Sequence, residues 1–294
     1  MLKSNSVLSW VYGVLFFLLL WVILYSKYGI WDNSIVFEYP EQEIEFAWDK
    51  LPMNGKNFDN KERFDKEFLG TSNNLYQFYL YVKRYPEYIP YIEKELKKAW
   101  IHDDFKYLPI AESALRDDVV SSAGAWWIWQ FMPETGKRYG LRIDEYVDER
   151  YDFEKATWAA IEYLSDLYED FWDWALVAAA YNRWENGLKR DMESQGVDNY
   201  YDLYLNEETS RYVFRILAIK YVMLSYFEKK ELIDRIIGGV NNVPETSIIE
   251  VKKIDDLRTW CKENGFNYKD IKILNRWIIG ESLPEWLWNI TILK

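Results

Sequence analysis

Residues 153–171, "FEKATWAAIEYLSDLYEDF", are followed after a single residue by "DWALVAAAYN" at 173–182. In the first segment, apolar residues recur at intervals of three and four, which is the spacing of one face of an α-helix. The second segment is apolar nearly all round, which is typical of a helix buried in a core. The pair predicts a helical domain in which 173–182 is a central element.

The chain before this pair has the same helical character. Between residues 60 and 99 the apolar residues keep helical spacing. We expect this pattern to be broken at Pro86 and Pro90, because proline has no N–H and its ring clashes with the preceding turn.

The chain after the pair predicts one more long helix, over 206–227, with Asn206 as its N-terminal cap. No segment between 60 and 230 has a convincing strand pattern. The predicted fold class is therefore mainly α, with an all-helical domain over 61–235.

The C-terminal segment 245–294 differs from the helical part. "SIIEVKK" (247–253) alternates like a strand, two short helical patterns follow, and "WNITIL" (288–293) predicts a second strand. A glycine-rich turn region at 238–244 precedes it. We expect a small α+β module with the order strand, helix, helix, strand.

The N-terminal segment predicts a membrane anchor. Residues 4–26 carry no charge and include "VLFFLLLWVIL". At about 1.5 Å per residue, a helix of this length crosses the ~30 Å hydrocarbon core of a bilayer. A cleavable signal peptide is the alternative, but the apolar region exceeds the usual ~7–15 residues and no A-x-A-like site follows. We expect an uncleaved anchor at 1–30 and a polar tether at 31–60.

Composition excludes several classes of function. The chain has 36 Lys+Arg against 48 Asp+Glu, a net charge of −12. No basic cluster is visible that would bind nucleic acid. The single Cys261 excludes an intrachain disulfide, and the lone His102 leaves no His/Cys zinc site, so we expect no metal and no cofactor. Chemistry must rest on carboxylates, hydroxyls and amides.

One acid stands out from the rest. "YLPIAESAL" (107–115) places Glu112 among apolar neighbours. A solvated helix position is the alternative, since most glutamates lie on the surface. A carboxyl held against apolar side chains has a raised pKa and can donate a proton near neutral pH, as the acid of a glycosidase does.

Short motifs follow Glu112 in a fixed order: "ES" at 112–113, Ser121, "GA" at 124–125, "WQFMPETG" at 129–136, "YGL" at 139–141 and "AYN" at 180–182. Together with "EETSRYV" (207–213), they make the segment from about 95 to 220 resemble the soluble lytic transglycosylase domain, which has a goose-type lysozyme-like fold. Within this family, the segment resembles the membrane-bound lytic transglycosylase D type. The C-terminal module resembles, less specifically, a LysM-like glycan-binding module.

The resemblance implies a role for each of six residues. These are Glu112 as the catalytic acid and base, Ser121 as a hydroxyl near the acid, Gln130 as a substrate-binding amide, Met132 as a residue shaping the glycan cleft, and Tyr181 and Asn182 on the helix facing the acid.

The resemblance also implies a reaction and a location. The expected reaction is cleavage of the β-1,4 bond between N-acetylmuramic acid and N-acetylglucosamine in peptidoglycan, with closure of a 1,6-anhydro ring. The domain is then expected to face the periplasm or the cell exterior from its membrane anchor, with peptidoglycan strands as its partner. Three alternatives stay open. The first is a degenerate protein that binds glycan without cutting it, and the second is a lysozyme-type hydrolase in which Asp117, Asp118 or Glu134 is a second working carboxylate. The third is a structural envelope protein with no affinity for glycan.

Tryptophan and glycine are present in unusual proportion. The chain has 16 Trp and 13 Gly, although about 21 Gly are expected at the usual ~7%. The family pattern has glycine where this chain has Trp100, Trp127, Trp172, Trp184 and Trp286. Trp100 and Trp184 also follow helix ends, where a left-handed residue is favoured.

Three explanations of these tryptophans compete. They are carbohydrate-stacking platforms, or marks of a degenerate enzyme, or glycines encoded by UGA codons that some bacteria read as glycine and others as tryptophan. We favour the third hypothesis, because it accounts for the low Gly count and the high Trp count together.

Overall fold

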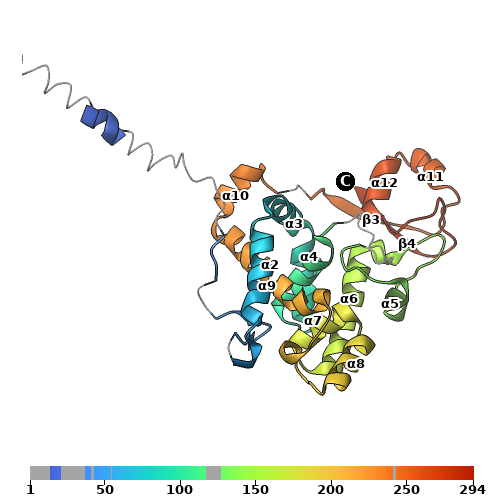
Figure 1. Cartoon of the computed structure of the whole chain (residues 1–294). Coiled ribbons are helices and arrows are strands. Elements are labelled where there is room, and N and C mark those ends of the chain that lie inside the picture. Colours follow the sequence, from blue (N-terminus) through green and yellow to red (C-terminus); the bar gives the residue numbers. More distant parts are fainter. Residues whose placement is uncertain (1–13, 21–36, 41–42, 54, 117–126, 241–242) are drawn as a thin grey trace, which may run out of the picture.

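The computed structural model describes residues 14–20, 37–40, 43–53, 55–116, 127–240 and 243–294. A helical body makes up most of it, and a small module with two strands lies beside this body (Figure 1). The helices of the body are α2 (Asn60–Ser72), α3 (Leu75–Lys98), α4 (Leu108–Ser113), α5 (Pro133–Arg138), α6 (Phe153–Phe171), α7 (Trp174–Arg183), α8 (Glu185–Gln195), α9 (Glu207–Glu228) and α10 (Lys230–Ile237). The predicted mainly helical class is confirmed.

Helix α7 lies at the centre of the body, as its apolar sequence predicts. Its first seven residues, Trp174–Ala180, are all buried. Helices α6 and α9 pack against it, and α2 lies along α9 on the other side. The side chains of these helices belong to one continuous hydrophobic cluster.

Polar side chains cap the helices where the sequence places them. The Asn206 side chain accepts a hydrogen bond from the Thr209 N–H, as predicted, and Asp152 and Asp173 cap α6 and α7 in the same way. A cap of this kind contributes about 1 kcal/mol to stability. The three caps fix where the long helices begin.

The expected break at Pro86 and Pro90 is wrong, because α3 continues through both prolines. Each proline removes one helical hydrogen bond. The helix nevertheless buries one apolar face that includes Val82, Ile89 and Ile92. Tertiary packing of this face offsets the local cost of the prolines.

The tether expected at 31–60 is only partly correct. Residues 45–50 form a hairpin of strands β1 (Glu45–Phe46) and β2 (Asp49–Lys50). Phe46 and Leu51 are buried in the core of the body. Because these apolar side chains have a place in the core, this part of the segment belongs to the folded body.

The C-terminal module has the predicted order of elements. Strands β3 (Thr246–Val251) and β4 (Trp288–Leu293) pair antiparallel, with α11 (Leu257–Glu263) and α12 (Tyr268–Leu274) between them in sequence. They enclose a second hydrophobic cluster, in which Cys261 is buried.

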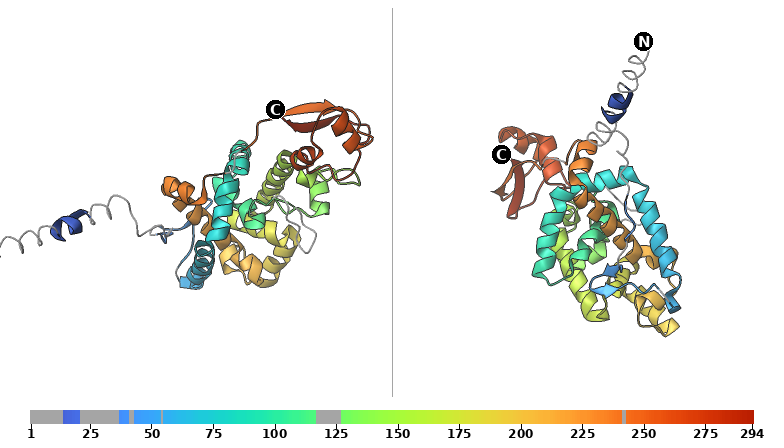
Figure 2. Two further views of the ribbon diagram at one scale, coloured as in Figure 1. Left: turned by 90° about the horizontal axis from the view of Figure 1, so that it is seen from above. Right: turned by 90° about the vertical axis from the view of Figure 1, so that its left-hand side faces the viewer.

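The module docks on the loop that follows α5. Val147 forms an isolated β-bridge with Ile278, and the N–H groups of Ile279 and Gly280 both donate to the Tyr146 carbonyl, at 3.0 and 2.9 Å. A Cβ on Gly280 would lie 3.1 Å from Tyr146 Cα, so this close approach favours glycine. Figure 2 shows the module beside the body in two further views.

The tryptophans proposed to occupy glycine positions have glycine-like backbones. Trp100, Trp127, Trp172 and Trp184 have φ of 60°, 68°, 52° and 72°. Trp286 is not among the residues with positive φ, so the backbone gives no support for glycine there. The positive φ predicted from helix ends at Trp100 and Trp184 is confirmed, and Trp127 and Trp172 have it as well.

Trp100 shows the reason for the left-handed conformation most clearly. Its N–H donates to the Lys97 carbonyl, and the Ile101 N–H donates to the Leu96 carbonyl. This pair of bonds is the Schellman motif, whose C′ residue is usually glycine. Trp184 has φ 72° and ψ 135°, close to a region that essentially only glycine adopts.

Trp48 belongs to the same group, although the sequence did not single it out. Ala47 and Trp48 form the two-residue turn of the β1–β2 hairpin, with φ of 47° and 76°. Positive φ at both positions defines a type I′ turn, in which the second residue is most often glycine.

The predicted membrane anchor falls largely outside the described residues. Of 4–26, the structure describes residues 14–20, which are helical. Within the described part of the chain, no helix has the length and apolar character needed to cross a bilayer.

Candidate functional site

Glu112 lies at the end of a short helix in the middle of the body. Helix α4 has Pro109 in its first turn, where a missing N–H has no cost, and it ends at Ala114, whose φ is 57°. The neighbouring Ser113 is buried and donates hydrogen bonds to the carbonyls of Pro109, at 3.1 Å, and Ile128, at 3.0 Å. These contacts fix the end of α4 and therefore the position of Glu112.

The carboxyl of Glu112 has the properties of a proton donor. Its pKa is raised from 4.5 to about 7, mainly by burial and to a smaller extent by the nearby charge of Glu208. A hydrogen bond that Tyr212 donates to Oε1, and the charge of Arg215, act in the opposite direction. Because burial dominates, a large fraction of Glu112 is protonated at neutral pH.

Helix α9 supplies the polar groups that act on Glu112. Glu208, Tyr212 and Arg215 are spaced by four and three residues, so they lie on one face of the helix. Tyr212 lies in the "EETSRYV" motif, but the motif alone predicts no role for it. The signal that could have found it is this stripe of polar residues on an otherwise buried helix.

Tyr181 and Asn182 connect α7 to its neighbours. The Tyr181 hydroxyl donates to the Trp129 carbonyl at 2.7 Å. Burial and the nearby charge of Glu112 raise the Tyr181 pKa well above its usual value, so the phenol stays protonated. Asn182 Oδ1 accepts a hydrogen bond from Thr209 Oγ1 at 2.9 Å, and Thr209 is a second α9 residue that the sequence analysis missed.

Side-chain hydrogen bonds therefore join four segments into a closed ring around Glu112. The bonds run from Ser113 to Ile128, from Tyr181 to Trp129, from Thr209 to Asn182, and from Tyr212 to Glu112. They link α4, the turn at 127–130, α7 and α9. Such a ring holds the acid in one orientation, as catalysis by proton transfer requires.

The remaining predicted site residues have no described contact with Glu112. Gln130 is half-buried with φ 52°, and its Nε2 donates to the Trp127 carbonyl at 2.6 Å, within its own turn. Met132 is the N-cap residue of α5, where its carbonyl accepts from the Gly136 N–H. The described contacts of these two residues do not reach Glu112. Ser121 lies outside the described residues, as do Asp117 and Asp118.

The two tryptophans next to Gln130 are part of the core. Trp129 is buried and its Nε1 donates to Thr157 Oγ1 at 3.0 Å. Trp127 is also buried, against the ring of Phe153, and among the described residues its Nε1 has no hydrogen-bond partner. The idea of Trp127 as a sugar platform is therefore wrong, because a buried ring has no face to offer to a sugar.

Two family models match the chain. Residues 90–203 match the family model of the transglycosylase SLT domain. Residues 248–286 match the soluble lytic transglycosylase C-terminal LysM-like domain. The first match includes Glu112, the turn at 127–130 and α7, whereas Tyr212 lies beyond its end. The resemblance predicted from the motifs is confirmed.

The chain is also similar to curated proteins. The chain is 27% identical over 246 residues to the membrane-bound lytic murein transglycosylase D of Escherichia coli strain K12, and equally to that of strain CFT073. Each alignment covers 81% of this chain and 52% of the relative, so the chain spans about half the length of these relatives.

A solved structure of lytic transglycosylase Slt from Pseudomonas aeruginosa, an inactive mutant, is also similar. It aligns at 20% identity with a TM-score of 0.38, over 47% of this chain and 24% of that chain.

Proposed function

We propose that this chain, which carries an SLT-type transglycosylase domain and a LysM-like domain, is a peptidoglycan lytic transglycosylase with Glu112 as its acid and base. The observation that carries the proposal is the buried Glu112, whose pKa is raised to about 7 and whose Oε1 accepts a hydrogen bond from Tyr212. One carboxyl with a pKa near the working pH can both give and take a proton.

In the first step, Glu112 protonates the oxygen of the β-1,4 bond between N-acetylmuramic acid and N-acetylglucosamine. The bond from C1 of the muramic acid to this oxygen breaks, and the N-acetylglucosamine leaves with a new hydroxyl. The muramic N-acetyl group stabilises the positive charge that develops at C1. Tyr212 holds Oε1, so we assign the transferred proton to Oε2.

In the second step, the Glu112 carboxylate takes the proton of the C6 hydroxyl of the same muramic acid. The C6 oxygen then bonds to C1, closing the 1,6-anhydro ring and restoring the protonated acid. This route needs neither a second carboxylate nor an activated water. Tyr212 stays protonated and uncharged in both steps, because burial and Glu112 raise its pKa well above the usual value.

One observation supports a specific alternative, hydrolysis. Glu208 is exposed on α9 and its charge acts on Glu112. In a lysozyme-type hydrolase, a second carboxylate of this kind would activate a water. Glu134, which the sequence analysis considered for this role, lies exposed in the first turn of α5.

The two ends of the chain have proposed roles in location and in glycan binding. We propose that residues 1–30 anchor the chain in the membrane and that the domain faces the periplasm or the cell exterior, where peptidoglycan lies. We assign a glycan-binding role to the LysM-like module, whose loop contacts place it beside the body. An acidic chain has no general electrostatic attraction to an anionic wall, so a dedicated binding module is useful.

Analysis of the products of purified peptidoglycan tests the function. Anhydro-muropeptides that disappear in Glu112→Gln are the expected result. Reducing ends that disappear in Glu208→Gln would instead establish a hydrolase. Retained binding to peptidoglycan with no released product would establish a protein that binds without cutting.

Tyr212→Phe should change the pH dependence of the reaction in a defined direction. The Tyr212 hydroxyl lowers the pKa of Glu112 by bonding to its carboxylate. Without it, the alkaline midpoint of kcat/KM should move upward from about pH 7. The rate at pH 6 should fall about 10-fold, the effect of losing one hydrogen bond to a charged group.

A pH profile of kcat/KM for both proteins measures this shift. Tyr204→Phe is a matched control, because Tyr204 is exposed on the surface and the substitution removes the same hydroxyl. An unchanged or lower midpoint in Tyr212→Phe would show that Tyr212 does not act on Glu112.

A further inference from the structure

The hydrophobic core of the C-terminal module includes a side chain of the helical body. Val147, in the loop between α5 and α6, has no exposed surface and belongs to the hydrophobic cluster of the module. Tyr151, near the end of the same loop, packs against the clusters of both the body and the module. The loop is therefore packed between the two parts, and its position depends on both.

The module also bonds to this loop at Asp148. The Asp148 N–H donates to the carbonyl of Trp277, which lies in the module, at 2.8 Å. The Asp148 carboxylate binds Arg150 through two atoms, with Nε donating to Oδ1 at 3.0 Å and Nη2 donating to Oδ2 at 2.6 Å. Asp148 and Arg150 are only 5% and 4% exposed. A guanidinium held at two nitrogens by one carboxylate has a fixed orientation.

The other end of the Arg150 guanidinium holds the segment that carries Gln130 and Met132. Arg150 Nη1 donates to the Phe131 carbonyl at 3.0 Å. The same side chain covers Gly136 of α5, since a Cβ on Gly136 would lie 3.3 Å from Arg150 Cγ. Gln130 and Met132 flank Phe131 in the chain. One buried side chain therefore ties the loop to the segment that is expected to contact the glycan.

Orientation is the main contribution of this buried ion pair. A buried pair often adds little net stability, because both charges lose their hydration. The Asp148–Arg150 pair nevertheless completes a series of contacts that runs from Trp277 of the module, through the loop, to the Phe131 carbonyl. Residues that support a binding segment in this way determine how precisely it is held.

The acid itself is held by other contacts. Glu112 lies on α4 and accepts its hydrogen bond from Tyr212 of α9. The contacts of Arg150 described above involve neither helix. A change at Arg150 should therefore affect the binding of substrate more than the protonation of Glu112.

We propose that Arg150 is a positioning residue, through which the docked C-terminal module sets the place of Gln130 and Met132 in the active site. This assignment rests on the proposed function, in which these two residues contact the glycan. Arg150 acts through the Phe131 carbonyl and does not touch the substrate. The module then has a role in the reaction that does not depend on its own contacts with glycan.

Hydrogen exchange in the full chain tests the connection between the module and the segment. In Gly280→Val, the added Cβ would lie 3.1 Å from Tyr146 Cα and would push the module away from the loop. The amides of Gly136 and Tyr139, which donate to nearby carbonyls in the wild type, should then exchange at least about tenfold faster.

Gly265→Ala is the control for this measurement. Gly265 lies in the module with φ 73°, so alanine strains the module, but nothing lies within 4 Å of the added Cβ. Exchange over residues 130–139 should stay at the wild-type rate in this variant. Faster exchange at Ile279 and Gly280 in Gly280→Val, with wild-type exchange over 130–139, would overturn the proposal.

Steady-state kinetics of Arg150→Lys test the positioning role. Lysine keeps the positive charge beside Asp148, but it has no second group with which to hold the Phe131 carbonyl. With a soluble, uncrosslinked peptidoglycan fragment as substrate, KM should rise about tenfold, within the range that a small misplacement of a binding segment causes. The alkaline midpoint of kcat/KM should stay at about pH 7, because Glu112 keeps its own contacts.

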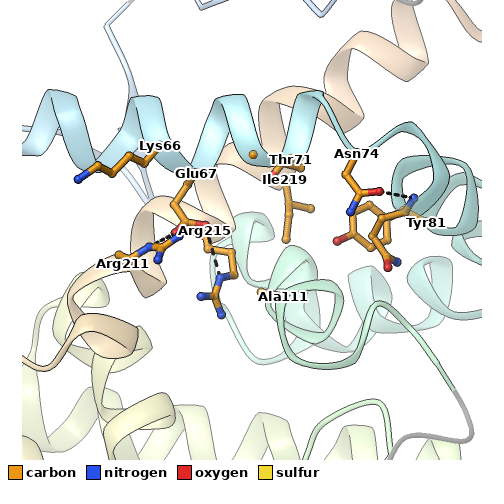
Figure 3. Close-up of a pocket in the computed structure, with 11 residues that line it drawn as sticks. Lys66, Glu67, Thr71, Asn74, Tyr81, Ala111, Arg211, Arg215 and Ile219 are labelled. Carbon is orange, nitrogen blue, oxygen red and sulfur yellow. Dashed lines mark hydrogen bonds and ion pairs between the residues drawn. The ribbon is translucent and has the colours of Figure 1, made fainter.

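Arg211→Lys is the matched control, because Arg211 also pairs with a buried carboxylate. Figure 3 shows Arg211 and Arg215 of α9 beside Glu67 of α2, away from the 130–132 segment. Arg211→Lys should therefore keep the wild-type KM. A loss of folded protein lowers the apparent kcat and leaves KM unchanged, so a lower kcat with an unchanged KM in Arg150→Lys would show that Arg150 is merely structural.

The outcome is separable from that of the proposed function, because hydrogen exchange does not require turnover. Faster exchange over 130–139 in Gly280→Val, in a chain that releases no anhydro product, would support the connection and contradict the transglycosylase. Normal release of anhydro product, with a wild-type KM in Arg150→Lys, would contradict the positioning role alone.

Discussion

Glu112→Gln should lower kcat for the release of muropeptides by at least about 1,000-fold, within the range that a positioned acid or base contributes. Glutamine has nearly the same size and can still accept the hydrogen bond from Tyr212. It cannot give a proton to the glycosidic oxygen or take one from the C6 hydroxyl. Because Glu112 serves both steps, the substitution removes proton donation and proton removal together.

The measurement is the initial rate of product release from purified peptidoglycan. Glu134→Gln is the control, since Glu134 belongs to the same motif region but is exposed in the first turn of α5. It should have the wild-type rate. A Glu112→Gln protein that retains a tenth of the activity would exclude Glu112 as the essential acid.

The same substitution should make the folded protein more stable at alkaline pH. The pKa of Glu112 is raised in the folded state from 4.5 to about 7. Between these values the folded chain binds more protons than the unfolded chain, so the free energy of unfolding falls as the pH rises. Glutamine has no charge to bury, and the gain above pH 7 should be about 2–3 kcal/mol.

Thermal unfolding of the two proteins at pH 8 and at pH 4.5 measures this gain. The difference in Tm should be large at pH 8 and should nearly vanish at pH 4.5, where the wild-type carboxyl is neutral in the folded state. A Glu112→Gln protein that is less stable at pH 8 would show that the ionised carboxylate is stabilised by its neighbours.

Replacing Trp100, Trp172 and Trp184 together by glycine should stabilise the protein. All three have positive φ, and a side chain in the left-handed region costs roughly 1–2 kcal/mol. Trp100 and Trp172 are 89% and 73% exposed, so these two substitutions remove little buried surface, whereas Trp184 is 47% exposed and loses more. After the greater flexibility of glycine in the unfolded chain is deducted, the net gain should be about 2–3 kcal/mol.

Denaturant unfolding of the triple variant measures this gain. Trp158→Gly is the matched control, because Trp158 is similarly exposed but lies inside α6, where glycine should cost about 1 kcal/mol. A triple variant that is no more stable than the wild type would show that the tryptophans fit their backbones.

The positive φ values of these tryptophans support the hypothesis of reassigned UGA codons, because this conformation favours glycine. That hypothesis expects glycine in the native protein at positions 127 and 184, and the hairpin turn adds Trp48 as a further position of the same kind. Peptide mass spectrometry of protein from its native source identifies the residues directly. Tryptophan at 127 and 184 would contradict the hypothesis.

The parts of the fold that could be predicted from the sequence are those determined by local chemistry. The bounds of α6, the cap at Asn206 and the strands of the C-terminal module follow from periodicity and capping residues. The left-handed backbone at Trp100 follows from its place after a helix end. None of these features depends on contacts with segments that are distant in the sequence.

The parts that could not be predicted depend on tertiary contacts. Helix α3 continues through Pro86 because its apolar face is packed, and the β1–β2 hairpin belongs to the body because the core accepts Phe46. Tyr212 is 100 residues from Glu112 in sequence, so only the folded chain shows their hydrogen bond. The side-chain amide of Gln130 donates to the Trp127 carbonyl of its own turn. The spacing of residues in the sequence does not predict this bond.

Digestion of peptidoglycan in water enriched in oxygen-18 tests the central claim most directly. If Glu112 closes the anhydro ring with the C6 oxygen of the muramic acid, no solvent oxygen enters the product. Mass spectrometry should then find every new muramic end as the unlabelled 1,6-anhydro form. New reducing ends with one oxygen-18 at C1 would contradict the account, because they would show that water, and not the sugar's own hydroxyl, attacks C1.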